Sequence, residues 1–296
     1  MAPGESRIAA MSSYYREHGP LSEPGRFRPV LAALPSDLPA LCRFIQGVVL
    51  HADWAAAYGV KDPTLSRETL PVERRMALVG EAGTTGLAPE QRTPGTCRDF
   101  ALMLCCLLRE RGIAARVRCG FATYFTGNPF EDHWVCEYWT ESKSRWALAD
   151  AQLDALMCDR LRIGFDATDL PAGTFLNAGE AWTMWREGKA GADAFGHGAA
   201  KGAWFMQVNL MRDLLSLNKQ ETSDWDAWRS FPADIQLLDA EALAVGDAIA
   251  AVTRRVGAFP PDGSALQRAQ RPSRHHALPS AIRNASATRM PGSSGV

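Results

Sequence analysis

Residues 95–112 read GTCRDFALMLCCLLRERG, and this stretch decides how the chain on either side of it is interpreted. Strong helix formers run from Arg98 to Arg111, and Gly112 follows in the position of a helix stop. The apolar residues recur at helical spacing: Phe100, Leu104, Leu107 and Leu108. We therefore expect a helix over 98–111 that begins at or beside Cys97.

The segments after this helix have the pattern of antiparallel strands. Residues 114–122 read AARVRCGFA, and residues 133–139 read HWVCEYW, rich in aromatic and β-branched side chains. Residues 141–144 predict a hairpin turn, and 145–150 predict the returning strand. A helix followed by antiparallel strands indicates an α+β fold.

Three side chains in this region could form a nucleophilic site. Cys97 lies at a predicted helix N-terminus, where unpaired N–H groups and the helix dipole favour a thiolate. His133 begins one strand of the hairpin and Asp150 ends the other, so the two can lie close together on one face. Asp150 would then accept the imidazole N–H and fix the orientation of His133, which would act as the base.

The same residues resemble the transglutaminase-like superfamily. The similar segments are GTCRDFA (95–101), LLRERGIAARV (107–117), DHWV (132–135) and RWALADA (145–151), in the order and spacing of that family. The resemblance implies an α+β, papain-like core, with the nucleophile helix packed on an antiparallel sheet. It also implies Cys97 as nucleophile, His133 as base and Asp150 as the orienting acid, without metal or cofactor.

Two further residues are candidates for contacts with the reacting group. Gln91 precedes the cysteine by a spacing similar to that of the oxyanion glutamine in the papain family, and its alternative interpretation is an exposed loop amide. Trp134 fits core packing or shielding of the imidazole. The backbone N–H of Cys97 is one natural donor to an oxyanion.

The resemblance leaves several functions open. It implies an acyl-transfer enzyme that acts on an amide or thioester through a cysteinyl acyl-enzyme, as a transferase or a hydrolase. One alternative is a biosynthetic enzyme on carrier-protein thioesters, either amide-forming or a Dieckmann-type cyclase. Another is a non-catalytic interaction module with the same fold. The expected partners are a peptide, amide or thioester substrate, which could be bound to a carrier protein.

Helices are expected on both sides of this core. We predict a flexible N-terminus over 1–22, a single transglutaminase-like domain over 23–260 with its core at about 90–155, and a disordered tail over 261–296 that is rich in Pro, Ser and Arg. Residues 80–94 read as a loop. Apolar periodicity and caps predict the additional helices: 38–50, 69–78, 178–187, 203–217 and 239–256.

Composition excludes some other classes. The 296 residues carry a formal net charge of −1, which gives no overall basic footprint for nucleic acid. No stretch approaches the ~20 apolar residues of a membrane span, and the first residues lack the apolar run of a secretory signal, so we expect a cytoplasmic protein. The seven cysteines include no C-x-x-C pair, and the six histidines follow no zinc-binding pattern.

The remaining polar residues are interpreted as structural. Asp132 should point to the face opposite His133, and Arg98 and Asp99 should satisfy charges at the helix start. His51 and His197 have no partner pattern. One face of a helix could carry Asn209, Asp213 and Asn218. We interpret this face as structural, and contact with a substrate is the less favoured alternative.

Overall fold

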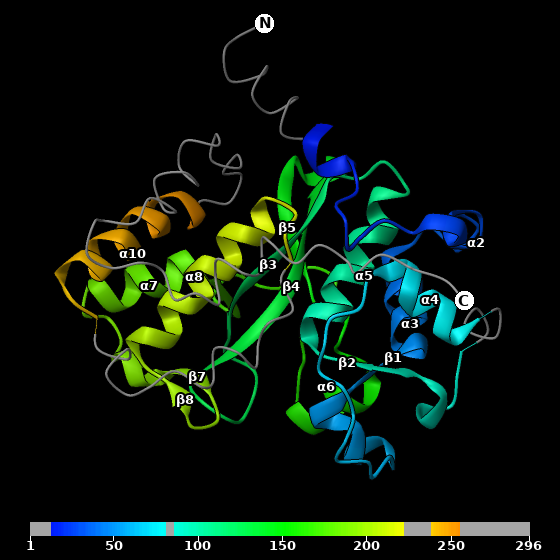
Figure 1. Ribbon diagram of the computed structural model, residues 1–296, viewed down its shortest axis with the longest axis horizontal. Coiled ribbons are helices and arrows are strands. Elements are labelled where there is room, and N and C mark those ends of the chain that lie inside the picture. The colour runs from blue at the N-terminus through cyan, green and yellow to red at the C-terminus, as the bar shows by residue number, and fades with distance from the viewer. Residues whose placement is uncertain (1–12, 81–85, 222–237, 255–296) are drawn as a thin grey trace, which may run out of the picture. The chain divides into compact units, whose positions relative to one another are not determined.

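The computed structural model describes residues 13–80, 86–221 and 238–254. These residues form an α+β fold, as the sequence predicts, and Figure 1 shows the sheet with α5 on one side and α7, α8 and α10 on the other. In chain order the elements are η1 (Gly25–Phe27), α2 (Arg28–Ala32), α3 (Leu38–Val48), β1 (Val49–His51), η2 (Ala52–Tyr58), α4 (Val72–Val79), η4 (Pro89–Gln91), β2 (Thr93–Gly95), α5 (Cys97–Arg109), β3 (Ala115–Ala122), β4 (Phe130–Thr140), η5 (Glu141–Lys143), β5 (Arg145–Ala149), α6 (Ala155–Leu161), β6 (Phe175–Asn177), α7 (Ala178–Arg186), η6 (Ala192–Ala194), β7 (Phe195–His197), β8 (Ala200–Lys201), α8 (Ala203–Leu217) and α10 (Ala240–Thr253).

Helix α5 is the centre of the main hydrophobic core. Its first turn is held by Asp99, whose carboxylate accepts a hydrogen bond from the Thr96 N–H at 2.8 Å. After the helix, Gly112 adopts a φ of +68°, a left-handed conformation that favours glycine. Every residue from the second to the last of α5 is buried, so the helix packs on all sides and fixes the position of its own N-terminus.

The main sheet has the strand order β6-β3-β4-β7-β8, and β5 also pairs with β4. Strands β3 and β4 are antiparallel with Gly120 opposite His133, and β4 and β5 are antiparallel with Cys136 opposite Ala149. Gly120 also lies against β6, where an added Cβ would come within 2.0 Å of the Leu176 carbonyl oxygen. Only glycine allows β6 to approach this closely, beside the strand that carries His133.

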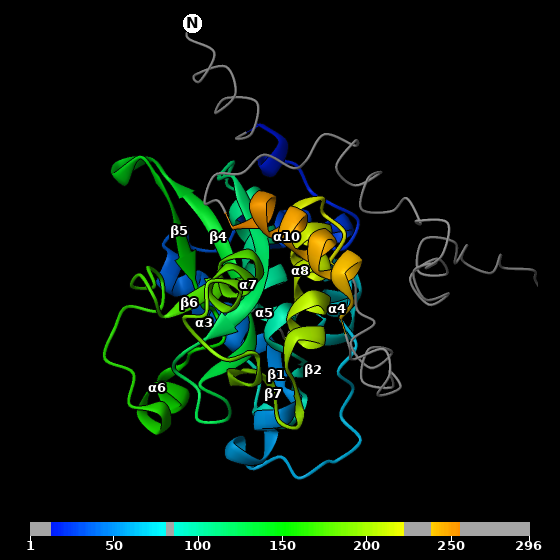
Figure 2. The same ribbon diagram turned by 90° about the vertical axis from the view of Figure 1, so that its left-hand side faces the viewer.

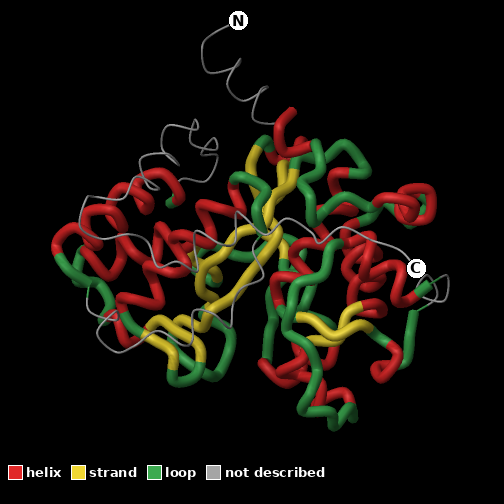
Figure 3. The backbone as a smooth tube through the Cα atoms, in the orientation of Figure 1, coloured by secondary structure: helices red, strands yellow, loops and turns green. Residues whose placement is uncertain are grey.

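A second, smaller sheet consists of β1 and β2 in parallel, and Figure 3 shows it apart from the main group of strands. The register pairs Val49 with Thr93 and His51 with Gly95. The sequence predicted a helix through Leu50, and the structure corrects this: the helix ends at Val48 and the chain turns extended at Val49. The pairing brings His51 beside the loop that leads into α5.

The two faces of the main sheet are covered differently. On β3, Val117 and Cys119 pack into the core around α5, whereas the neighbouring Arg118 bonds to Asp213 of α8. This alternation is that of a strand with both faces buried. Helices α7, α8 and α10 pack against one another over the second face, as Figure 2 shows from that side.

The structure changes several other expectations. Residues 13–22, predicted to be flexible, are packed in place, because Tyr15 and Ser22 are fully buried and the Tyr15 hydroxyl donates to the Leu217 carbonyl oxygen at 2.9 Å. Helix α6 and the short strands β6, β7 and β8 were not predicted. Residues 1–12 and the predicted tail over 261–296 lie outside the described residues.

Candidate active site

A cavity of about 180 Å³ opens beside the N-terminus of α5. Cys97 and His133 both line it, so the helix start and strand β4 face the same space. Aromatic side chains form part of the wall: Trp54, Phe125 and Trp134. Cys97 is partly exposed to the cavity, whereas the cysteines deeper in α5, Cys105 and Cys106, are buried.

His133 and Asp150 form a buried, hydrogen-bonded pair. The imidazole Nε2 lies 2.8 Å from Oδ2 of Asp150, and both side chains are almost fully inaccessible. The Tyr124 hydroxyl donates to the same Oδ2 at 2.8 Å, and the Gln152 N–H donates to Oδ1 at 3.0 Å. The carboxylate is therefore fixed on both oxygens, and it fixes the ring of His133 in turn.

Asp150 contacts Nε2 of His133, and the ring lines the same cavity as Cys97. Burial alone would lower the pKa of His133, but the Asp150 carboxylate, its hydrogen bond to the ring and a hydrogen bond with Cys97 raise this pKa to about 10. The imidazole is thus protonated at neutral pH.

The loop before Cys97 is held by a buried ion pair. Asp99 bonds to the guanidinium of Arg75, and both side chains are inaccessible to solvent. Arg75 also donates to the Pro94 carbonyl oxygen at 3.1 Å, and so ties α4 to the residues just before the nucleophile. Asp99 therefore serves the helix start, as its position in the sequence indicated.

Gln91, predicted as a possible oxyanion donor, lies away from the cavity. It is exposed at the end of η4, and its Oε1 accepts a hydrogen bond from the Ala88 N–H at 3.3 Å. It does not line the cavity, and the sequence spacing to Cys97 therefore misplaced it. Trp134 does line the cavity, with the guanidinium of Arg98 5.1 Å from its ring centroid.

Sequence reasoning missed other residues that the fold brings to the cavity. His51 and His197, interpreted as structural, both line it. His197 bonds through Nδ1 to Glu131 at 2.6 Å, and this hydrogen bond raises the pKa of His197. No local pattern marks either histidine, because each lies in a strand of only three residues. The partner of His51 is distant in the chain, whereas His197 pairs with Ala200 of the adjacent β8.

The predicted polar face of α8 does not reach the cavity. Asn209 donates to Asp132 at 2.7 Å, Asp213 binds Arg118, and Asn218 donates to the Leu214 carbonyl of its own helix at 2.8 Å. Asp132 does line the cavity, although it was expected to face away from it. The face of α8 is therefore a packing surface against the sheet.

No cluster of three or more His, Cys, Asp or Glu side chains in the described part of the chain has the arrangement of a metal site. None of the helices between residues 13 and 254 that the structure describes is long and apolar enough to span a membrane.

Comparison with known proteins agrees with the geometry of this region. Residues 81–151 match the model of the transglutaminase-like superfamily, and these residues include Cys97, His133 and Asp150. The segment is a transglutaminase-like core. The match of this segment to the superfamily supports cysteine-based catalysis as the general class of activity.

A solved structure is also similar to part of the chain. It is the crystal structure of a proposed cysteine protease from Cytophaga hutchinsonii, with 16% sequence identity and a TM-score of 0.34. The alignment covers 51% of this chain and 45% of that one, so the chain spans less than half of that protein. No curated protein matches the chain.

Proposed function

We propose that this protein is a cysteine-dependent acyl-transfer enzyme, with Cys97 as nucleophile, His133 as acid and base and Asp150 as the orienting group. The observation that carries the proposal is that Cys97 and His133 line one cavity and that His133 is hydrogen-bonded to Asp150. A nucleophile, a base in contact with it and a third group that orients the base form the general arrangement for covalent catalysis.

The geometry supports a reaction in two steps. The Cys97 thiolate attacks the carbonyl carbon of an amide or thioester, and the new C–S bond gives a tetrahedral intermediate. As the bond to the leaving amine or thiol breaks, the His133 imidazolium gives its proton to that group, and an acyl-enzyme remains. His133, now neutral, takes a proton from the acceptor, which attacks the acyl carbon and releases the cysteine.

The size of the cavity limits what enters it. Its volume of about 180 Å³ is below the range of roughly 300–1,000 Å³ that is usual for complete ligand sites. Only the reacting end of a substrate fits inside, and the remainder lies outside the cavity. A small acyl thioester is therefore a suitable first probe.

The proposal is tested with S-acetyl-N-acetylcysteamine and mass spectrometry of the acid-quenched protein. The wild type should carry an acetyl adduct on the peptide that contains Cys97. Cys97→Ala and His133→Ala should both reduce turnover to background, because the members of a triad act as a unit. Cys158→Ala is the matched control, since Cys158 is the other partly exposed cysteine, and it should keep both adduct and turnover.

The rate at which the adduct is lost is then compared in water alone, with an added amine and with a carbon nucleophile. These acceptors correspond to hydrolysis, amide formation and cyclisation. The acceptor that discharges the adduct fastest defines the subclass. Turnover that persists in Cys97→Ala, with no adduct in the wild type, would rule out the covalent mechanism and favour a non-catalytic interaction module.

A further inference from the structure

His51 reaches the cavity through the small parallel sheet. Its strand partner is Gly95, two residues before Cys97, so the pairing of β1 with β2 places His51 beside the N-terminus of α5. The side chain is 8% exposed and lines the same cavity as Cys97 and His133. Its ring lies nearly parallel to that of Phe100, with the ring centroids 6.4 Å apart.

The hydrogen bonds of His51 define which of its nitrogens carries the proton. Nδ1 accepts a hydrogen bond from the Asp53 N–H at 3.2 Å, so in the neutral ring the hydrogen must be on Nε2. Nε2 has no hydrogen-bond partner in the described part of the chain. A buried N–H donor beside the nucleophile is thus available to a ligand.

His51 is neutral under ordinary conditions. Burial lowers its pKa to about 4, and the positive charges of His133 and His197 lower it further against the opposing effect of Asp53 and Asp99. It therefore cannot replace His133 as the base at pH 7. A neutral imidazole can still donate a hydrogen bond to a carbonyl oxygen, a role known for histidine in enzyme active sites.

A second donor lies next to it. Cys97 is the first residue of α5, where a backbone N–H has no partner within its own helix. When a thiolate attacks a carbonyl carbon, negative charge develops on the carbonyl oxygen, and N–H donors at that point stabilise the transition state. Because Gln91 lies outside the cavity, this function needs another side chain.

We propose that Nε2–H of His51 and the backbone N–H of Cys97 together bind the carbonyl oxygen of the acyl substrate and the oxyanion that forms on attack. This inference rests on the proposed acyl-transfer function and adds a catalytic residue to it. The donor is contributed by β1, outside residues 81–151, so the helices and strands that precede the transglutaminase-like core complete its active site.

The experiment compares two reactions of the same thiol. Transfer of the acetyl group from S-acetyl-N-acetylcysteamine passes through an oxyanion, whereas alkylation by iodoacetamide displaces iodide at a saturated carbon and does not. His51→Phe and His51→Leu should lower kcat/KM for acetyl transfer by about 10²–10³-fold, the loss expected for one oxyanion donor. Both should leave the rate of Cys97 alkylation within about threefold of wild type, since the His133–Asp150 pair is intact.

His51→Gln provides the matched control, because its amide N–H can donate. It should recover part of the lost kcat/KM. Equal losses of acetyl transfer and alkylation in all three variants would mean that His51 only supports the structure, and unchanged acetyl transfer in the apolar variants would mean that it does not contact the oxyanion. Either result overturns this inference while the acetyl adduct on wild-type Cys97 stands, and only loss of that adduct overturns the proposed function.

Discussion

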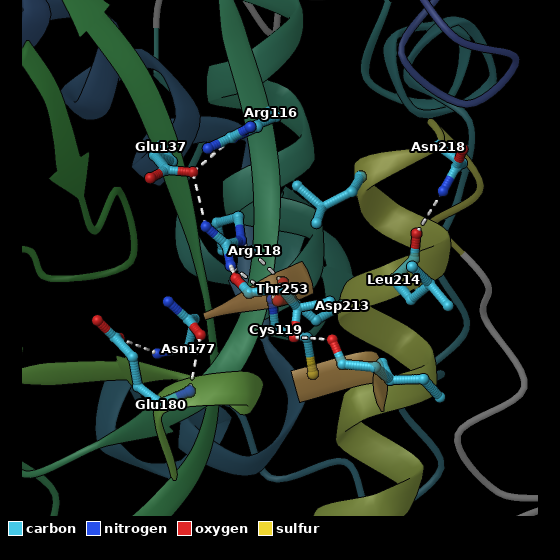
Figure 4. Close-up of polar contacts among 12 residues, drawn as sticks. Arg116, Arg118, Cys119, Glu137, Asn177, Glu180, Asp213, Leu214, Asn218 and Thr253 are labelled. Atoms are coloured by element: carbon cyan, nitrogen blue, oxygen red, sulfur yellow. Dashed lines mark hydrogen bonds and ion pairs between the residues drawn. The ribbon is translucent and has the colours of Figure 1, made fainter. Parts of the chain in front are cut away.

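Two parts of the β3–β4 pair carry buried charges, but only one of them lines a cavity. Where β3 ends and β4 begins, His133 is bonded to Asp150 and lines the same cavity as Cys97. Further along the pair, where α8 packs against β3, Arg118 lies between two carboxylates, those of Glu137 and Asp213 (Figure 4). The two charge clusters differ in what surrounds them.

The Arg118 guanidinium is bound by partners from β4, α8 and α10. Arg118 contacts Glu137 at 2.8 Å and binds Asp213 through two nitrogens at 2.8 and 2.9 Å. The same guanidinium donates to the Thr253 carbonyl of α10 at 2.7 Å, as Figure 4 shows. Burial raises the pKa of Glu137, but the adjacent Arg116 and Arg118 hold it below its ordinary value. None of these residues lines the cavity, so the network joins α8 and α10 to the sheet.

The region of Cys97 differs in offering a donor to a ligand. His51 Nε2 has no hydrogen-bond partner among the described residues, and His51, Cys97 and His133 line one cavity. Burial of charge by itself therefore does not indicate catalysis. A cavity, a transferable proton and unsatisfied donors together do.

The largest effect is expected from removing the charge of Asp150. Asp150→Asn keeps the shape of the side chain but cannot stabilise the imidazolium, so kcat/KM for acetyl transfer should fall by about 10²–10⁴-fold. Steady-state kinetics with S-acetyl-N-acetylcysteamine measures it. Gln91→Ala, whose side chain lies outside the cavity, is the control and should retain wild-type activity. A loss of less than about threefold in Asp150→Asn would contradict the orienting role.

Changes in the Arg118 network should affect stability instead of reactivity. Asp213→Ala leaves Arg118 with one of its two carboxylate partners, and breaking a buried ion pair in this way costs about 3–5 kcal/mol of the free energy of unfolding. Urea denaturation measures the loss. In the folded fraction, the rate of Cys97 alkylation should stay within about threefold of wild type. A stable Asp213→Ala protein in which Cys97 is alkylated more slowly would show that the Arg118 network and the Cys97 site are coupled.

The smallest effect concerns the alkaline limb of the pH–rate profile. In the proposed mechanism the imidazolium form of His133 donates the proton in the first step. Its raised pKa means that this form is present at neutral pH and lost as the pH rises through about 10. Wild-type kcat/KM for an anilide substrate, whose leaving amine needs that proton, should fall over this range. In Asp150→Asn no carboxylate raises the pKa of His133, so kcat/KM should fall at lower pH than in the wild type. The pKa read from this limb belongs to Cys97 and His133 as a coupled pair. An identical alkaline limb in the wild type and in Asp150→Asn would mean that Asp150 does not raise the pKa of His133.

The parts of the molecule that could be predicted are those whose signals are local. Helix α8 has the predicted bounds, and α5 begins at Cys97, because the cap, apolar periodicity and glycine stop lie within the helix or next to it. The His133–Asp150 contact could also be predicted, since a hairpin links the two residues. Segment 81–151 is long enough to carry a family pattern of its own.

The missed features depend on contacts between distant residues. Strands β1 and β2 have three residues each, and β2 contains Pro94. Neither strand has a recognisable pattern in isolation. His51 could be placed only by knowing that β1 pairs with β2. Gln91 failed as a prediction for the related reason that a spacing along the chain does not define the direction of a side chain at the end of a 3-10 helix.

The pairing of His51 with Gly95 also bears on when the chain acquires its reactivity. The two residues are joined only by closing a long loop, an entropic cost that is offset once the surrounding core has formed. Before that stage Cys97 lies neither at a helix terminus nor in one cavity with His133. In the proposed mechanism, acyl transfer therefore begins only when the fold is complete, and its onset reports the end of folding.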